Sequence, residues 1–453
     1  MTPSWTKMKD HPEQIRLLRS TARFRVVPAG RRSGKTELVG KRQMILRCMN
    51  CHDITSRYYS KFPDPKFFIG APTRDQVKRI YWQDVKNLTP SWALKKKPNE
   101  SQLILTFFNN TELHLLGMDR PERAEGSPWD GGVLDEYGNM HEETWPEHVR
   151  PALSDRNGTC DFIGVPEGRN HYYELYNKAK SRNAETLRLG LMPEWDTFWW
   201  ISADILPPSE IRAAREDLDE LTYQQEYEAS FVNFSGRAYY PFLEQTHCRP
   251  LPYDEWGDLI LMFDFNTAPG VAVVAQEMIL PTIEATPGTG IIGEVYIPRA
   301  SNTELVTRRL INDWPDHRGR IFVYGDYTGG AKTTAAIMGS DWEIIKRMLR
   351  EHYGPDRTFF KLKPNPKERA RVNAVNSRLM SMDGTVRMMV DPARAPKVVK
   401  DFEGVVLVEG GSGEIDKSSN PKLTHMTDAI GYYTWREFPI TRTWQPMKER
   451  YWK

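Results

Sequence analysis

A phosphate-binding motif stands near the start of the chain, at residues 29–36 (AGRRSGKT). The pattern G-x-x-x-x-G-K-[ST] binds nucleotide phosphates through backbone N–H groups, a lysine and a hydroxyl. Here Lys35 reaches the β- and γ-phosphates and Thr36 ligates Mg²⁺, but Ala29 replaces the first glycine. The motif predicts an ATP-binding loop made of Gly30, Arg31, Arg32, Ser33, Gly34, Lys35 and Thr36.

Two adjacent acids, Asp135 and Glu136, follow the short apolar run GGVL. Phosphoryl transfer from ATP needs one carboxylate that holds Mg²⁺ through water and another that activates the attacking water. We therefore predict that Asp135 serves the metal and that Glu136 is the catalytic acid, with Lys35 steadying the transferred phosphoryl group. Without the upstream loop, an ordinary acidic turn after a strand would explain both residues.

Three further aspartates suit a second chemistry in the C-terminal half. Asp264 interrupts the apolar run 259–266 (LILMFDFN), Asp326 ends 320–326 (RIFVYGD), and Asp428 begins 427–433 (TDAIGYY). Converging carboxylates repel one another unless cations lie between them. The trio predicts two divalent ions, Mg²⁺ or Mn²⁺, with Asp264 bridging them and the other two aspartates each holding one.

Some candidates near this trio stay open. His425, three residues before Asp428, is either an assistant at the metal or an ordinary loop histidine. Asp401 and Glu294 are the replacements if Asp326 is not a ligand.

The elements that position these residues follow from hydrophobic patterning. Apolar, β-branched runs predict strands at 24–28, 131–135, 160–163, 259–266 and 271–275 and another at 320–326, and helical spacing predicts a helix from Glu37 and one at 427–433. An acidic helix is predicted over 211–229, with Ser209 as its N-cap. This alternation indicates an α/β protein.

Composition limits the class of protein. The chain has 453 residues, 39% hydrophobic and 27% charged, enough for two or three domains with cores of their own. It shows no membrane-spanning run and no signal-peptide core, which favours the cytoplasm. Cys48, Cys51 and His52 match a haem-attachment spacing, but reduced buried thiols are the favoured interpretation.

Basic residues are concentrated in residues 346–371, which hold nine Lys or Arg against three acids. Such a run is either a solvated face or a grip on a phosphate backbone. The candidates for DNA contact are Lys361, Lys363, Lys367, Arg369 and Arg371.

The loop at 30–36, with HPEQ at 11–14 upstream and Leu134-Asp135-Glu136 downstream, resembles the ATPase half of the large terminase subunit of tailed bacteriophages. The resemblance implies that Gln14 reads the adenine and that Arg32 acts on the γ-phosphate in cis. The alternatives are an ordinary surface glutamine near a helix start and an ordinary surface arginine. Arg120 and Arg123 are equal candidates for a finger toward a neighbouring subunit. Residues 164–168 (GVPEG) fall at the family's coupling motif but lack its hydroxyl-bearing residue.

The C-terminal half resembles the terminase nuclease, because a strand acid, a later strand acid and a helix acid stand in the order of an RNase H-like fold. The sequence QEY at 225–227 matches the helix that joins motor and nuclease in this family. The resemblance implies an N-terminal P-loop ATPase of the ASCE type with a parallel sheet (1–205), a helical linker (206–240) and a C-terminal RNase H-like nuclease domain (241–453).

The implied function is ATP-driven translocation of double-stranded viral DNA into the procapsid, with metal-dependent cleavage of concatemeric DNA. The implied partners are DNA, the portal protein and the small terminase subunit, with a homo-oligomeric ring on the procapsid, no membrane, and residence in the host cytoplasm outside the mature virion. The alternatives are a helicase or repair-type ATPase without nuclease activity, and an assembly protein without enzyme activity.

Overall fold

The computed structural model describes residues 11–56, 58–232, 236–264, 269–282, 284–299, 301–327, 340–408, 413–418 and 423–440. The chain forms two compact units. The described residues up to Ile211, with 224–232, belong to unit 1, and Arg212–Tyr223 with the described residues from 236 onward belong to unit 2. Residues of the predicted linker therefore occur in both units.

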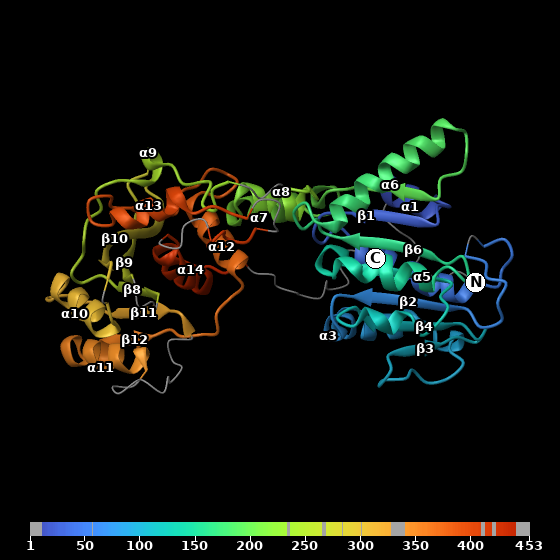
Figure 1. The fold of residues 1–453 in the computed structure, drawn as a ribbon, viewed down its shortest axis with the longest axis horizontal. Coiled ribbons are helices and arrows are strands. Elements are labelled where there is room, and N and C mark those ends of the chain that lie inside the picture. The colour runs from blue at the N-terminus through green and yellow to red at the C-terminus, as the bar shows by residue number, and fades with distance from the viewer. Residues whose placement is uncertain are drawn as a thin grey trace. The chain divides into compact units, whose positions relative to one another are not determined.

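Unit 1 is built on a seven-stranded sheet in the order β3-β4-β2-β5-β6-β1-β7 (Figure 1). Every neighbouring pair is parallel except β3 and β4. The strands are β1 (Phe24–Pro28), β2 (Lys66–Ala71), β3 (Ile104–Thr106), β4 (Glu112–Gly117), β5 (Gly131–Asp135), β6 (Thr159–Gly164) and β7 (Trp195–Thr197).

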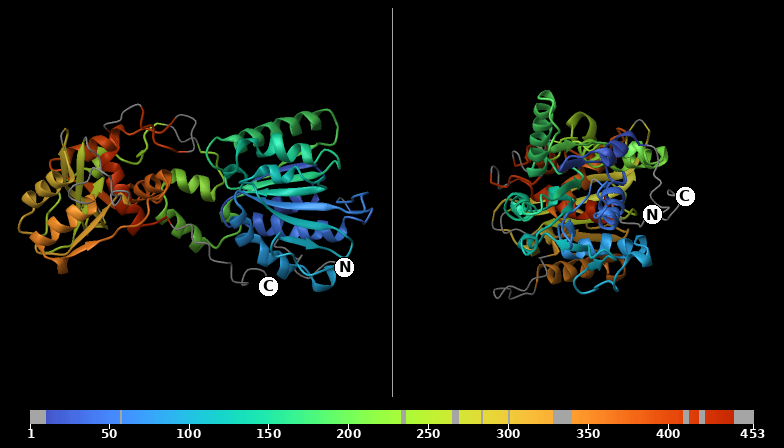
Figure 2. Two further views of the ribbon diagram at one scale, coloured as in Figure 1. Left: turned by 60° about the horizontal axis from the view of Figure 1, so that its bottom comes forward. Right: turned by 90° about the vertical axis from the view of Figure 1, so that its right-hand side faces the viewer.

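Helices cover both faces of this sheet (Figure 2). In β1, Phe24 and Val26 join the core on one face and Val27 joins the core on the other, as alternation along a strand requires. The helices are α1 (Pro12–Arg19), α2 (Met44–Asn50), α3 (Arg74–Val77), α4 (Gln83–Leu88), α5 (Arg150–Ala152) and α6 (His171–Arg188), with π-helical turns over Thr36–Gln43, Lys78–Trp82 and Trp145–Val149.

A buried ion triad joins the neighbouring strands β1 and β6 to α2. Arg25 of β1 and Asp161 of β6 are register partners, with the Arg25 Nη2 2.7 Å from the Asp161 carboxylate. Arg25 Nε also donates to this carboxylate, and Arg47 of α2 donates a third hydrogen bond to it. The Arg47 and Asp161 side chains are fully buried. Burial opposes charge, but the two guanidinium groups hold the pKa of Asp161 below its usual value.

Unit 2 contains a six-stranded sheet in the order β12-β11-β8-β9-β10-β13. Strands β8, β11 and β12 are parallel, β9 is antiparallel to β8 and β10, and β13 is parallel to β10. Their bounds are β8 (Leu259–Asp264), β9 (Gly270–Ile279), β10 (Pro287–Ile297), β11 (Ile321–Gly325), β12 (Thr358–Phe360) and β13 (Met388–Val390).

The two faces of this sheet carry different helices. Leu259, Leu261 and Phe263 of β8 share a core with α10 (Thr303–Asp313) and α11 (Asp341–Tyr353). The alternate residues of β8, including Asp264, point to the other face, where α14 (His425–Glu437) packs on β8, β9 and β11. The other α-helices that lie wholly within the described part of unit 2 are α9 (Glu244–His247), α12 (Glu368–Leu379) and α13 (Pro396–Gly404).

The acidic segment departs from its prediction. The predicted helix over 211–229 is two helices, α7 (Pro208–Asp217) and α8 (Glu220–Tyr227), and Ser209 lies inside the first turn of α7 instead of capping it. The helix is interrupted at Asp219, whose buried carboxylate accepts hydrogen bonds from the Tyr240 hydroxyl and the Thr222 N–H. The predicted strand 259–266 is described only to Asp264.

All four cysteines are buried and outside disulfides. Cys48 lies in α2 and Cys51 directly after it, while the His52 ring contacts the Asn109 carbonyl. Burial raises the pKa of the Cys48 and Cys160 thiols well above the usual range and that of Cys248 to about 11. No helix in the described part of the chain is long and apolar enough to cross a membrane.

Candidate ATPase and metal-binding sites

The phosphate loop lies at the C-terminal end of β1 and is held by backbone hydrogen bonds. Ala29 N–H donates to Gly164 O (3.1 Å) and Gly30 N–H to Trp200 O (3.0 Å). A Cβ at Gly30 would lie 2.4 Å from the Ser202 hydroxyl, so close packing demands glycine there. Because Ala29 continues the extended chain, the position where the motif departs from the usual pattern tolerates a side chain.

The backbone carbonyl of Ser33 anchors the phosphate loop to two side chains. It accepts hydrogen bonds from Gln14 Nε2 (3.1 Å) and Trp200 Nε1 (3.0 Å). Gln14 is only 2% exposed, which excludes the alternative of an ordinary surface glutamine. The ring of His11, the N-cap of α1, packs against Trp200.

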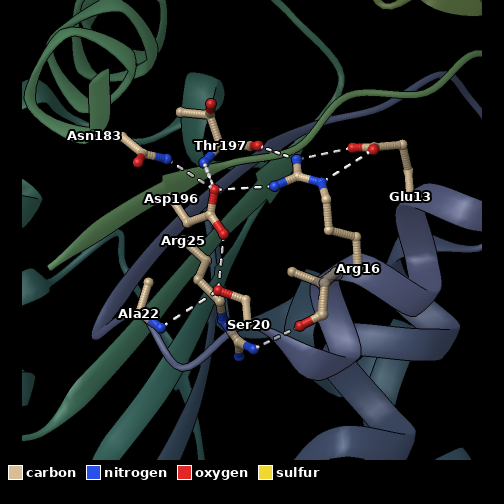
Figure 3. A network of polar contacts seen from close by, with 9 residues as sticks. Glu13, Arg16, Ser20, Ala22, Arg25, Asn183, Asp196 and Thr197 are labelled. Atoms are coloured by element: carbon tan, nitrogen blue, oxygen red, sulfur yellow. Dashed lines mark hydrogen bonds and ion pairs between the residues drawn. The ribbon is translucent and has the colours of Figure 1, made fainter. Parts of the chain in front are cut away.

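Helix α1 is itself tied to the edge strand β7 (Figure 3). The Arg16 guanidinium contacts the Asp196 carboxylate (3.1 Å), the Glu13 carboxylate and the Thr197 carbonyl. The Ser20 hydroxyl donates to the same Asp196 (2.9 Å). These contacts hold Gln14 beside the loop.

The predicted catalytic residues come together behind the loop. The Thr36 hydroxyl donates to Asp135 Oδ2 at 3.2 Å, and the Lys35 ammonium lies 4.0 Å from the Glu136 carboxylate. Asp135 ends β5, and Glu136 follows with a left-handed backbone (φ 54°). Burial raises the pKa of both carboxyl groups, Lys35 opposes the shift, and the charge of Asp135 adds to the rise at Glu136. A divalent cation fits the hydroxyl and carboxylate donors of this pair.

Tyr81 is a site residue that sequence reasoning missed. Its buried hydroxyl donates to the same Asp135 oxygen as Thr36 does. Gly40, in the π-helical turn after the loop, makes room for it, because a Cβ there would lie 2.4 Å from the Tyr81 hydroxyl. An aromatic residue distant in sequence carries no motif, and the glycine inside a helix was the available signal.

The segment at 164–168 contacts Glu136, the predicted catalytic residue, through its backbone. Val165 N–H donates to Glu136 Oε2 (3.4 Å), and Gly168 N–H donates to Gln225 Oε1 of α8 (3.1 Å). The Glu226 carboxylate pairs with Arg31 at 3.0 Å. Among the two loop arginines, Arg31 is thus engaged with α8, whereas Arg32 is exposed at a left-handed position (φ 56°).

Arg120 directly precedes the turn Pro121–Ala124, and Arg123 lies within it, before β5. Both are exposed, as a side chain that reaches a neighbouring subunit has to be.

In unit 2, the sheet register places two of the three predicted aspartates at neighbouring strand ends. Phe263 and Gly325 are partners in the parallel pair β8 and β11, and Asp264 and Asp326 follow them. Asp428 lies in the first turn of α14, which packs on both strands. Burial raises the pKa of Tyr432, and the charges of all three carboxylates add to the shift.

Each aspartate also has a partner. Asp264 lies 3.1 Å from His425 Nδ1, Asp326 accepts a hydrogen bond from Asn365 (2.6 Å), and Asp428 pairs with Arg371 (3.0 Å). Burial raises the pKa of Asp428. Within the described residues, no three His, Cys, Asp or Glu side chains are already arranged as a metal-binding group.

Asp401 and Glu294, the alternative candidate ligands, accept hydrogen bonds from backbone N–H groups at the starts of helices. Asp401 accepts the Met426 N–H at the start of α14 (3.0 Å), and burial raises its pKa to about 7. Glu294 accepts the Lys397 and Val398 N–H groups at the start of α13. These roles leave Asp326, which follows the strand next to β8, as the stronger candidate ligand.

The prediction that the basic run contacts DNA is wrong at one residue. Arg371 is buried and paired with Asp428, so it does not belong to a DNA-binding surface. Lys363 and Lys367 are exposed. Lys361 and Lys363 line a small hollow together with Tyr432.

The two units define a class: a P-loop ATPase of the α/β type followed by an RNase H-like unit, as the sequence predicted. Over 94% of this chain and 99% of the other, the fold matches the large terminase of a thermophilic bacteriophage, with a TM-score of 0.59 and 14% identity. That large terminase has also been solved with ATP-γ-S and with ADP.

Comparison of the sequence with those of known proteins identifies more specific relatives. No family model matches it. It is 25% identical over 286 residues, 57% of this chain, to the terminase large subunit of Thermus phage G20c, and 24% identical over 194 residues to that of Escherichia phage T5. The first match spans about half the relative's length, 55%. The chain is a homologue of bacteriophage terminase large subunits, which confirms the resemblance seen in its motifs.

Tyr81→Phe tests the contact with Asp135. The folded protein should lose about 1–3 kcal/mol of unfolding free energy at pH 8, where a buried carboxylate loses a donor. The loss should shrink toward pH 5, because removal of the donor raises the pKa of Asp135 further and protonation then relieves the folded state. Denaturant unfolding at both pH values measures the difference.

Tyr172→Phe is the matched control, because this buried hydroxyl donates to a neutral acceptor, the Phe162 carbonyl. Its cost should not depend on pH over the same range. An equal cost of Tyr81→Phe at both pH values would contradict the contact with an ionisable group.

Proposed function

We propose that this chain is the large subunit of a phage terminase, an ATPase that drives double-stranded DNA into a procapsid and a metal-dependent endonuclease that cuts concatemeric DNA. The observation that carries the motor half is the convergence of Lys35, Thr36, Asp135 and Glu136 behind a loop held by Gln14. The named relatives and the nucleotide complexes of the thermophilic phage's large terminase support the same assignment.

In the motor, the loop N–H groups and Lys35 bind the phosphates, and Thr36 and Asp135 would hold a Mg²⁺ ion that would supply charge neutralisation at the phosphates. Glu136 orients the attacking water and accepts its proton, for which its raised pKa suits it. Arg32 acts on the γ-phosphate in cis, and Gln14 reads the adenine. Because Val165 N–H donates a hydrogen bond to Glu136, a change in the position or charge of this carboxylate acts directly on the backbone of the 164–168 segment.

In the nuclease, Asp264, Asp326 and Asp428 would hold Mg²⁺ or Mn²⁺, because a donor set rich in carboxylates suits hard cations. The ions supply activation of water and charge stabilisation at the scissile phosphate. The partners are DNA, the portal protein, the small terminase subunit and further copies of this chain in a ring. The place of action is the host cytoplasm.

A helicase or repair-type ATPase without nuclease activity is the second candidate, favoured only by the general nature of the P-loop. Incubation of purified protein with plasmid and Mn²⁺ or Mg²⁺, with and without ATP, separates the two. Metal-dependent cutting supports the terminase, and strand separation without cutting supports the helicase.

Lys35→Ala should abolish ATP hydrolysis, because it removes the charge that stabilises the transferred phosphoryl group. Glu136→Gln should retain ATP binding and stop turnover, because only the chemical step needs the carboxylate. Binding of a fluorescent ATP analogue and phosphate release measure the two effects. Lys86→Ala, an equal loss of charge at a surface ion pair of unit 1, is the control, and normal turnover by Glu136→Gln would refute the assignment.

Replacement of Asp264, Asp326 or Asp428 by Asn should each eliminate plasmid cleavage, because each removes a charged metal ligand. ATP hydrolysis should persist, since Thr36 and Asp135 hold the motor's ion in the other unit. Asp313→Asn removes a carboxylate from the surface of α10 and should leave cleavage unchanged. Cleavage by Asp326→Asn at the parent rate would exclude that residue as a ligand.

The double variant Lys363→Ala, Lys367→Ala tests the basic surface. If both side chains bind phosphates, DNA affinity should fall for all sequences, and the slope of log affinity against log salt should flatten by roughly 0.9 for each phosphate that is no longer neutralised. Arg308→Ala with Arg309→Ala removes the same charge from α10 and should not change the slope. An unaltered slope in the lysine variant would mean that the basic run is a solvated face.

A further inference from the structure

Asp428 has cations on both of its carboxylate oxygens. Arg371 Nη2 lies 3.0 Å from Oδ1, and Lys417 Nζ lies 3.6 Å from Oδ2. Any divalent ion that takes Asp428 as a ligand must approach an oxygen that one of these side chains now faces. Like charges repel strongly at such distances in a partly buried site.

The two cations differ in their freedom to move. Arg371 is 7% exposed, and its guanidinium packs 4.5 Å from the centre of the Tyr432 ring. Gly431 lets α12 and α14 approach here, since a Cβ would lie 3.2 Å from the Arg371 Cβ. The Lys417 side chain is 52% exposed. Arg371 is therefore a fixed counter-charge, whereas Lys417 can withdraw.

Lys417 also has a second acceptor. Its ammonium lies 2.9 Å from Glu368 Oε2, closer than it lies to Asp428. The other oxygen of Glu368 accepts the Ile415 N–H at 2.7 Å, which fixes this carboxylate beside the segment that carries the lysine. Lys417 can thus leave Asp428 without losing its ion pair with Glu368.

We propose that the Lys417 ammonium competes with the divalent cation for the Asp428 carboxylate, while its ion pair with Glu368 keeps it near the site. Its ammonium neutralises Oδ2 while the site holds no metal, and metal binding confines the lysine to Glu368. Arg371 keeps Oδ1 neutralised in both states and positions the carboxylate. This inference rests on the proposed nuclease site and identifies two residues that tune its metal affinity without touching the reacting atoms.

The test is Mn²⁺ binding to the full-length chain without nucleotide, measured from the free-ion signal in electron paramagnetic resonance. The nuclease-site component is the part of the binding isotherm that Asp264→Asn abolishes. Lys417→Gln should tighten this component by about three- to tenfold, the size of one partly screened charge interaction. Lys417→Arg, which keeps the competing charge, should leave the component near the parent affinity.

Lys400→Gln, which removes an exposed lysine from α13 of the same unit, is the control and should not change Mn²⁺ binding. If Lys417→Gln leaves the nuclease-site component unchanged or weakens it, the competitor role is wrong while the metal site stands. If Asp264→Asn binds Mn²⁺ as the parent does, the metal site itself is wrong and the competitor role falls with it. Thermal unfolding of each variant confirms that folding is intact.

Discussion

The charge triad inside unit 1 holds the ATPase architecture together. Asp161 of β6 forms an ion pair with Arg25 on the adjacent strand β1 and another with Arg47 on α2. Removal of one partner from such a buried ion pair strongly destabilises the fold, because the remaining charge is neither paired nor hydrated. The phosphate loop is the connection between β1 and the helical segment that ends in α2, so both of its supports depend on this one carboxylate.

Both proposed sites use the same geometric principle. In each sheet, acids sit where parallel strands end side by side, at the carboxyl edge that α/β proteins commonly use for ligands. In unit 1 this brings Asp135 to Thr36, and in unit 2 it brings Asp264 to Asp326. The units differ in how the acids are balanced: a lysine of the loop and a tyrosine serve the first, and an arginine, a lysine and a histidine serve the second.

The sequence predicted what local patterns encode. Strands before Gly30, Glu136 and Asp326 are short apolar runs, and their hydrophobicity identifies them without tertiary information. The order of motifs then predicted both sheets. Gln14 was found only because the family resemblance assigns it a role.

Partners distant in sequence escaped prediction. Tyr81, Glu226 and Lys417 reach their sites through the packing of separate elements, and no spacing rule links them to Asp135, Arg31 or Asp428. The break at Asp219 escaped for the same reason. Helical propensity favours a continuous helix there, but the buried hydroxyl of Tyr240 and the N–H of Thr222 bind that carboxylate.

The burial of the four cysteines has a practical consequence for following this protein at work. Thiol-reactive dyes attack the thiolate, and a buried thiol with a raised pKa offers little of it at neutral pH. A single cysteine introduced on an exposed helix face would therefore be labelled in preference to the native ones. Fluorescent pairs could be placed on the two units without first replacing Cys48, Cys51, Cys160 or Cys248, so their separation during a nucleotide cycle becomes observable in the natural sequence background.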